Sequence, residues 1–171
     1  IFINKEHTYV FDPEFAFYGP MGYDIGNVIA NMFFAWANGD ATIEDAAQKE
    51  EFCGWVIDCI EEIVDKFIAK FKKAYQEHVT DIMAKTEGFM DYYLGTVLAD
   101  TAGIAGLESI RRIVGMANNK DITTIQDEEK RARAERIIVT LAKNYIMNRT
   151  QFTSGAAYRK AIEEAIATFK N

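Results

Sequence analysis

Between Ile43 and about Val79, apolar residues recur at every third or fourth position, and this periodicity constrains the fold more than any other feature. Such spacing places side chains on one face of an α-helix. A long helix of this kind must pack its apolar face against other helices, so the sequence predicts a helical fold. The glycine at position 54 predicts an interruption of this helix. The apolar positions are Phe52, Val56, Cys59, Ile60, Ile63, Phe67 and Phe71.

Further helices are expected on both sides of this segment. The run IGNVIANMFFAWAN is apolar nearly all round, which predicts a deeply buried helix, and Asp24 precedes it as the expected N-cap. Thr42 and Asp45 have capping-box spacing and are expected to begin the long helix. Three more helices are expected towards the C-terminus, over residues 91–115, 127–148 and 156–170.

The first residues show a different pattern. IFIN and TYVF are rich in β-branched and aromatic residues and are separated by KEH, so residues 1–12 are expected to form a β-hairpin. We find no repeat and no interdomain linker. We therefore expect residues 1–171 to form a single domain, mainly α with a small N-terminal β-hairpin, in which residues 24–171 form the helical body.

Composition excludes some functions. The formal net charge of −7 over 171 residues argues against general binding of nucleic acid or anionic membranes, which requires a basic surface. Cys53 and Cys59 would lie about 9 Å apart along a helix, too far for a disulfide. We therefore expect two reduced thiols in the core of a cytoplasmic protein.

Two carboxylates flank a proline at the end of the predicted hairpin. In an extended strand Asp12 and Glu14 point to the same side, and Pro13 stiffens the pair. Two carboxylates on a rigid element suit Mg²⁺, which binds a few carboxylates together with phosphate oxygens and water. The alternative is that Asp12 opens a turn and Glu14 is a solvated loop residue, because Asp-Pro is common in turns. Spacing alone does not decide between them.

Two adjacent arginines form the second candidate site. Arg111 and Arg112 lie within the apolar stretch GLESIRRIVG, where an unpaired charge would be costly. One interpretation is a structural ion pair with one of the many acidic residues. The other is a pair of cations that bind a phosphate or sugar, because the guanidinium group suits oxygen ligands.

Taken together, these segments resemble a known family. The stretch VFDPEFAFYGPMGYDIGNVIAN closely resembles the corresponding part of the 5-methylthioribose kinases, which belong to the aminoglycoside-phosphotransferase and protein-kinase-like superfamily. GLESIRRIVGMA looks like the twin-arginine segment of that family, and YIMNRTQF is similar to the end of its C-terminal helix. These three segments occur in the same order as in the family and extend over almost the whole chain.

The resemblance implies the C-terminal lobe of a kinase-like fold and a role for each candidate residue. Asp12 and Glu14 would bind Mg²⁺ that bridges the phosphates of ATP. Arg111 and Arg112 would bind the substrate, methylthioribose, and Asp24 would anchor the catalytic loop. The implied reaction transfers the γ-phosphate of ATP to the 1-hydroxyl of S-methyl-5-thioribose, a step of methionine salvage. The family also suggests a homodimer.

The chain also departs from the family. The catalytic loop that carries the presumed base would lie before Ile1, and the N-terminal lobe is missing, so no catalytic residue is assigned and the chain alone is expected to be inactive. Asn118 stands where the family suggests histidine. Two alternatives remain: another small-molecule kinase acting on an aminoglycoside, choline or homoserine, or a helical binding module without catalytic activity.

Overall fold

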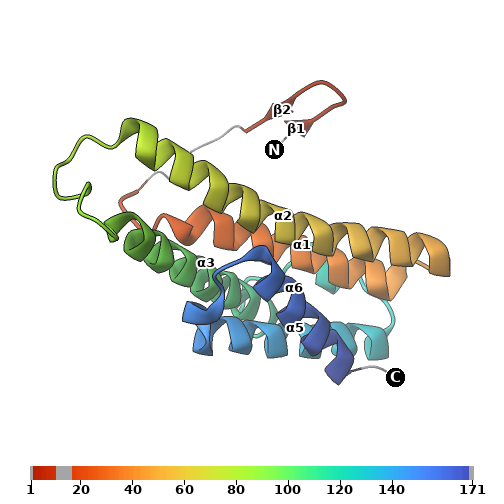
Figure 1. The fold of residues 1–171 in the computed structure, drawn as a ribbon. Coiled ribbons are helices and arrows are strands. Elements are labelled where there is room, and N and C mark those ends of the chain that lie inside the picture. Colours follow the sequence, from red (N-terminus) through yellow and green to blue (C-terminus); the bar gives the residue numbers. More distant parts are fainter. Residues whose placement is uncertain (1, 11–16, 170–171) are drawn as a thin grey trace.

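The computed structural model describes residues 2–10 and 17–169, and this part of the chain is mainly helical, as predicted (Figure 1). A two-stranded hairpin precedes a body of packed helices. The elements, in chain order, are β1 (Phe2–Ile3), β2 (Thr8–Tyr9), α1 (Gly22–Thr42), α2 (Ala46–His78), α3 (Phe89–Ile113), α4 (Lys120–Thr123), α5 (Glu128–Met147), the 3-10 turn η1 (Arg149–Gln151) and α6 (Gly155–Thr168).

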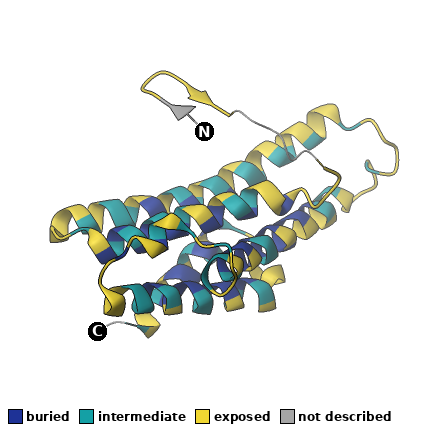
Figure 2. Cartoon of the chain, turned by 180° about the vertical axis from the view of Figure 1, so that it is seen from behind, coloured by how far each residue is buried: buried dark blue, intermediate teal, exposed yellow. Residues whose placement is uncertain are grey.

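Helix α1 lies at the centre of the body, where it packs against α2, α3, α4 and α5. Ile29, Phe33 and Phe34 are almost completely buried. The ring of Phe33 stacks on that of Trp36, with centroids 5.1 Å apart and planes within 4° of parallel. The prediction of a buried helix here is confirmed, and Figure 2 shows that buried residues line the inner sides of the helices around it.

The start of α1 differs from the expectation. The helix begins at Gly22, Met21 is the N-cap residue without a side-chain hydrogen bond, and Asp24 lies exposed in the first turn. The Tyr23 amide donates to the carbonyl oxygen of Pro20 at 3.0 Å, so the first turn closes before Asp24. The prediction that Asp24 caps this helix is therefore wrong, although a carboxylate in the first turn still favours the positive helix end.

The start of α2 is also later than expected. Thr42 is the last residue of α1, and its hydroxyl donates to the carbonyl oxygen of Asn38 at 2.8 Å. Asp45 is the N-cap of α2, and its carboxylate accepts from the Gln48 amide at 2.8 Å. The capping box was thus wrong, because the proposed cap residue still belongs to the preceding helix. The expected interruption is absent as well, since α2 continues through Gly54.

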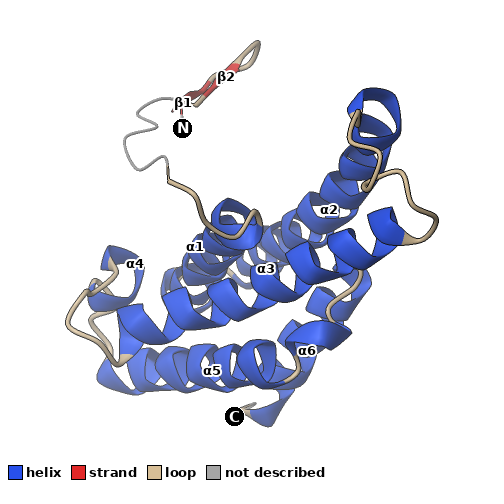
Figure 3. Ribbon diagram, turned by 90° about the vertical axis from the view of Figure 1, so that its left-hand side faces the viewer, coloured by secondary structure: helices blue, strands red, loops and turns tan. Residues whose placement is uncertain are grey.

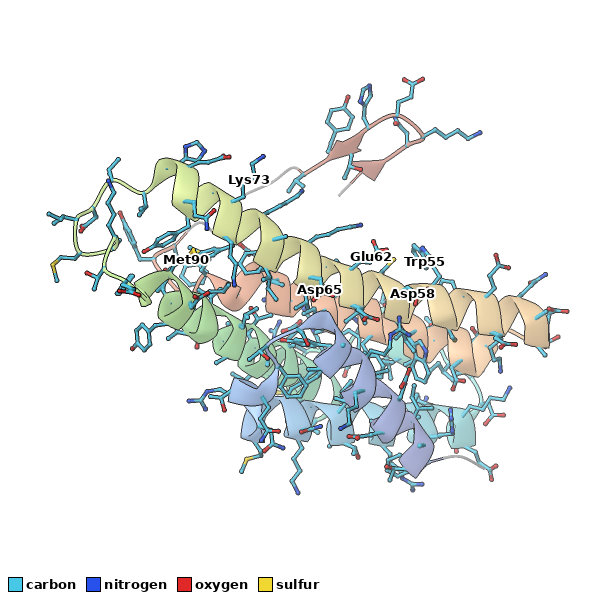
Figure 4. All side chains as sticks on the ribbon, viewed as in Figure 1. Trp55, Asp58, Glu62, Asp65, Lys73 and Met90 are labelled. Atoms are coloured by element: carbon cyan, nitrogen blue, oxygen red, sulfur yellow. The ribbon has the colours of Figure 1, made fainter. Side chains whose placement is uncertain are left out.

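Other helix starts follow local chemistry. Asp127 caps α5, as its predicted start implies, and accepts from the amides of Glu129 and Lys130, both at 3.0 Å. Gly88 precedes α3 with a φ of 79°, a left-handed conformation that glycine adopts without steric cost. The Gly155 amide at the start of α6 donates to a carboxylate oxygen of Asp65 at 2.7 Å, and Figure 4 shows Asp65 on α2 beside α6.

The predicted hairpin is present. Strands β1 and β2 pair antiparallel, with Phe2 opposite Tyr9 and Ile3 opposite Thr8. The Asn4 side chain stabilises the turn by accepting from the amides of Glu6 and His7 at 2.9 and 2.6 Å. Figure 3 shows the hairpin lying apart from the helices. The hairpin is therefore a short paired ribbon, and the helices alone form the core.

Helices α1 and α3 run side by side in the same direction (Figure 1). Their closest approach is at Gly26, where an added Cβ would lie 2.7 Å from the Thr101 carbonyl oxygen and 3.0 Å from the Ala105 nitrogen. Only glycine fits at this distance. None of the helices within residues 17–169 is sufficiently long and apolar to span a lipid bilayer.

Candidate functional site

The predicted metal ligands, Asp12 and Glu14, lie outside the described residues, so the metal site stays a prediction. Within residues 2–10 and 17–169, no group of three or more histidine, cysteine, aspartate or glutamate side chains could hold a metal ion. Cys53 and Cys59 are both partly buried and neither forms a disulfide. Burial raises the pKa of the Cys53 thiol to about 11, so this group is a protonated packing residue at neutral pH.

The twin arginines share one carboxylate. The Nε of Arg111 lies 2.9 Å from Oε2 of Glu108, and the Nε of Arg112 lies 2.6 Å from Oε1 of the same side chain. All three residues lie in the last turns of α3, at i, i+3 and i+4. Although adjacent helical residues diverge by about 100°, the long arginine side chains both fold back to the carboxylate one turn earlier. Both arginines therefore form the ion pair with an acidic residue that one of the two interpretations predicted, and a role in ligand binding stays a prediction.

The shared carboxylate is buried and the arginines are not. The Glu108 side chain is 7% exposed, whereas Arg112 is 31% and Arg111 is 55% exposed. Burial alone would raise the pKa of Glu108, but the hydrogen bonds from the two arginines outweigh it and lower this pKa. The hydrogen bond between Arg111 and Glu108 also raises the pKa of the Arg111 guanidinium. The cluster is thus charged at neutral pH and presents its cations outwards.

A cleft of about 360 Å³ lies beside the exposed arginine. Helix α3 supplies one wall and the first turns of α1 supply the other. Because α1 and α3 lie parallel and close, residues more than 80 positions apart in the sequence meet here. The lining residues are Tyr23, Asn27, Ile104, Leu107, Glu108 and Arg111.

The α1 wall of the cleft contains two polar residues that the sequence analysis missed. Asn27 donates its side-chain amide to the carbonyl oxygen of Tyr23 at 2.8 Å. The Tyr23 ring meets that of Phe17 edge-on, with centroids 5.3 Å apart. Their spacing of four residues on an otherwise apolar helix was the available signal. Only the packing of α1 on α3 shows that they lie near Arg111.

The other candidate residues do not join this cleft. Asp24 is exposed and does not line it. Asn118, which stands where the family resemblance suggests histidine, is exposed, and its backbone carbonyl oxygen lies 3.5 Å from Nη1 of Arg112. The cleft therefore combines one exposed guanidinium and two polar side chains with the apolar residues Ile104 and Leu107. This combination suits a small molecule with both polar oxygens and an apolar group.

Comparison with known proteins relates the chain to kinases. It is 33% identical to methylthioribose kinase 1 of Oryza sativa subsp. japonica over an alignment that covers 90% of this chain and 38% of the relative. It is also 33% identical to the methylthioribose kinase of Geobacillus sp., where the alignment covers the whole chain and 40% of the relative. The methylthioribose kinase of Exiguobacterium sibiricum is 35% identical, with 88% of this chain and 36% of the relative covered.

These relatives are all kinases by name, and the similarity extends over the whole chain. The chain belongs to the methylthioribose kinase family. It spans about two fifths of the length of the curated relatives it matches. No protein-family model matches it. The helical fold is consistent with the C-terminal lobe of a kinase-like protein.

Proposed function

We propose that the full-length protein containing this chain transfers the γ-phosphoryl group of ATP to the 1-hydroxyl of S-methyl-5-thioribose. In this proposal Asp12 and Glu14 are the Mg²⁺ ligands, and Arg111 and Arg112 bind the substrate and offset the charge of the phosphoryl group. The family assignment supports the reaction class. The substrate comes from the names of the relatives.

The observation that carries the proposal is the arrangement of the two arginines. Two guanidinium groups share a single buried carboxylate, so one positive charge of the pair is left over at the edge of a cleft. A purely structural ion pair does not need this excess charge. A site for a phosphoryl group does, because charge on the transferring oxygens must be balanced in the transition state. Ile104 and Leu107 offer the methylthio group an apolar surface.

The donor set fits a magnesium ion. Asp12 and Glu14 supply two hard carboxylate oxygens two residues apart, and Mg²⁺ prefers a small number of carboxylates plus phosphate oxygens and water. When bound, Mg²⁺ would neutralise charge on the ATP phosphates. The residues of this chain have the other proposed roles. The arginines orient the substrate and stabilise negative charge, and the cleft between α1 and α3 encloses the substrate.

The test is an ADP-release assay on the full-length protein with ATP, Mg²⁺ and methylthioribose, beside choline, homoserine and kanamycin. We expect turnover with methylthioribose alone. Asp12→Asn should abolish turnover, because it removes a metal ligand. Arg111→Ala should lower kcat/KM by about 100-fold, equivalent to about 2.7 kcal/mol of transition-state stabilisation. Asp24 does not line the cleft, and in this proposal it anchors the catalytic loop, so Asp24→Asn should lower kcat more than it changes the KM for methylthioribose.

The other outcomes separate the alternatives. Turnover with choline, homoserine or kanamycin would agree with the proposed metal ligands Asp12 and Glu14 but would reject methylthioribose as the substrate. If the protein turns over none of the four acceptors, and ATP protects the wild-type protein and Asp12→Asn equally, a binding module without catalytic activity is favoured. Our proposal includes a cytoplasmic homodimer and no activity for residues 1–171 alone. Analytical ultracentrifugation of the full-length protein and the same assay on a clean preparation of the chain test the last two statements.

A further inference from the structure

We infer that Glu108 is a positioning residue of the acceptor site: it holds both guanidinium groups by their Nε atoms and leaves one outward-facing terminal NH2 group of each for the substrate. This inference rests on the proposed function and deepens it, because it adds a residue that acts through the arginines and not on the substrate. It starts from the division of one carboxylate between two cations.

Glu108 holds each arginine through a single nitrogen atom. Each oxygen of Glu108 accepts one Nε–H, at 2.9 Å from Arg111 and at 2.6 Å from Arg112. In a guanidinium group bonded through Nε–H, one terminal NH2 group lies on the same edge as the Nε–H, and the other lies on a different edge and faces away from the carboxylate. In the described part of the chain, Arg111 has no further ion pair or hydrogen bond, and Arg112 has only the 3.5 Å contact with the Asn118 carbonyl oxygen.

The burial of the Glu108 carboxylate has an energetic cost. A carboxylate that is 7% exposed loses most of its hydration, and this cost is offset only if strong partners replace the water. Exposed helical pairs in the same protein have no such cost: Lys66 and Glu62 on α2 are 68% and 61% exposed. Burial of the acid beneath two exposed cations thus fixes the arginine stems and lowers the entropy that they lose when substrate binds.

Two substitutions of Glu108 should differ in their effects on the arginines. In Glu108→Gln the side chain keeps its size, but the amide has one acceptor oxygen and one donor nitrogen. It therefore holds one arginine and places a donor against the other. In Glu108→Asp the charge stays but the carboxylate retracts by one methylene group, so both hydrogen bonds lengthen. Loss of one charge-assisted hydrogen bond corresponds to about a tenfold or larger effect.

The experiment measures the KM for methylthioribose and the KM for ATP separately in the full-length protein. We expect Glu108→Gln to raise the KM for methylthioribose by about tenfold or more and to change the KM for ATP by less than about twofold. Glu108→Asp should restore part of the loss. The matched control is Glu61→Gln, which removes a partly buried carboxylate bound to Arg159 and lies outside the cleft. It should leave both KM values unchanged even if it lowers stability.

A double-mutant cycle then tests whether Glu108 acts through the arginines. If it does, Glu108→Gln and Arg111→Lys disturb the same interaction. The KM for methylthioribose of the double variant should then be little higher than that of the more impaired single variant. Arginine Nε–H signals in ¹⁵N NMR spectra give a readout that does not depend on activity. Two signals should be protected from solvent exchange in the wild-type protein, and one of them should lose this protection in Glu108→Gln, because the amide keeps a single acceptor oxygen.

Each outcome has a distinct meaning. Normal turnover by the wild-type protein with an unchanged KM for methylthioribose in Glu108→Gln would overturn the inference and leave the proposed function intact. An equal rise in both KM values, or additive effects in the cycle, would reduce Glu108 to a structural residue and so overturn it too. Absence of wild-type turnover on methylthioribose would overturn the proposed function, and the inference with it.

Discussion

Two arginine clusters in this protein have opposite compositions. On α3, two arginines share one carboxylate, Glu108. Between α2 and α6, one arginine, Arg159, contacts three acidic residues: Asp58 and Glu61 on α2 and Glu163 on its own helix. Figure 4 shows Asp58 and Asp65 on the part of α2 near α6. The first cluster has an excess of positive charge, and the second has an excess of negative charge.

The difference supports our proposal that the first cluster serves binding and the second serves packing. The Arg159 cluster joins two helices and does not line the cleft between α1 and α3, so its ion pairs stabilise the contact between α2 and α6. The ion pairs of the Glu108 cluster lie within a single helix, and among the described residues none of them joins α3 to another helix. One of its cations, Arg111, lines a cleft instead, as expected of a site that binds a negatively charged group.

The largest expected effects come from the glycines at the two helix contacts. An added Cβ at Gly26 would lie 2.7 Å from the Thr101 oxygen, and one at Gly155 would lie 2.2 Å from the Glu61 oxygen. We expect Gly26→Ala and Gly155→Ala each to lower the free energy of unfolding by about 2–3 kcal/mol, because overpacking forces the helices apart. Urea denaturation measures this quantity.

Activity separates the two glycine variants. Gly26→Ala displaces α1 from α3 and so widens the cleft, which should raise the KM for methylthioribose in the full-length protein. Gly155→Ala acts on the distant contact and should leave this KM unchanged. Equal KM values in both variants would contradict the assignment of the cleft to the space between α1 and α3.

The next effect concerns stability alone. Arg159→Ala leaves three carboxylates without their shared cation, two of them on α2. We expect a loss of about 1–2 kcal/mol in the free energy of unfolding, because the arginine and Glu61 are partly shielded from water. The kcat/KM of the full-length protein should stay within about twofold of wild type. A fall in kcat/KM comparable with that of Arg111→Ala would remove the distinction between the clusters.

A smaller effect concerns pH. The folded-state pKa of Glu108 lies below its ordinary value of 4.5, so ionised Glu108 stabilises the fold above this pH. The stabilisation is lost as the pH falls below 4.5 through the lowered folded-state pKa, since the unfolded protein then binds the proton more readily. Urea denaturation of wild type and Glu108→Gln between pH 6 and 3 should therefore show a steeper loss of stability in wild type. Parallel curves would contradict the two arginine hydrogen bonds.

The smallest effect is expected at an exposed ion pair. Glu62 and Lys66 on the outer side of α2 form a contact in which both side chains are more than half exposed. Glu62→Gln should change the free energy of unfolding by less than about 0.5 kcal/mol, because solvent screens such pairs. The same denaturation measurement provides the baseline against which Arg159→Ala is judged.

Local patterns predicted most of the helices and failed at two of their starts. The period of three to four residues placed α2, α3, α5 and α6 to within a few residues. The predictions that Asp24 and Thr42 begin helices were wrong, because the start of a helix depends on where the preceding backbone stops being extended. In α1 a turn at Pro20 begins the helix before Asp24. Residue type alone does not contain this information.

The site was predicted in part. The twin arginines were recognised, and their partner Glu108 was present three and four residues earlier, a spacing that indicates helical ion pairs. Tyr23 and Asn27 were not predicted, because they reach the arginines only through the packing of α1 on α3. No local pattern specifies which of several apolar helices will become neighbours. The placement of Asp12 and Glu14 relative to this cleft stays a prediction.

The parallel packing of α1 and α3 also determines the order in which the protein can be assembled. Synthesis of α1 ends at Thr42, but its neighbour α3 is complete only at Ile113, 71 residues later (113 − 42). At about 5–20 residues per second, the α3-facing side of α1 waits roughly 4–14 s for its partner. During translation, the most apolar helix of the chain therefore depends on α2, or on a chaperone, for protection against aggregation.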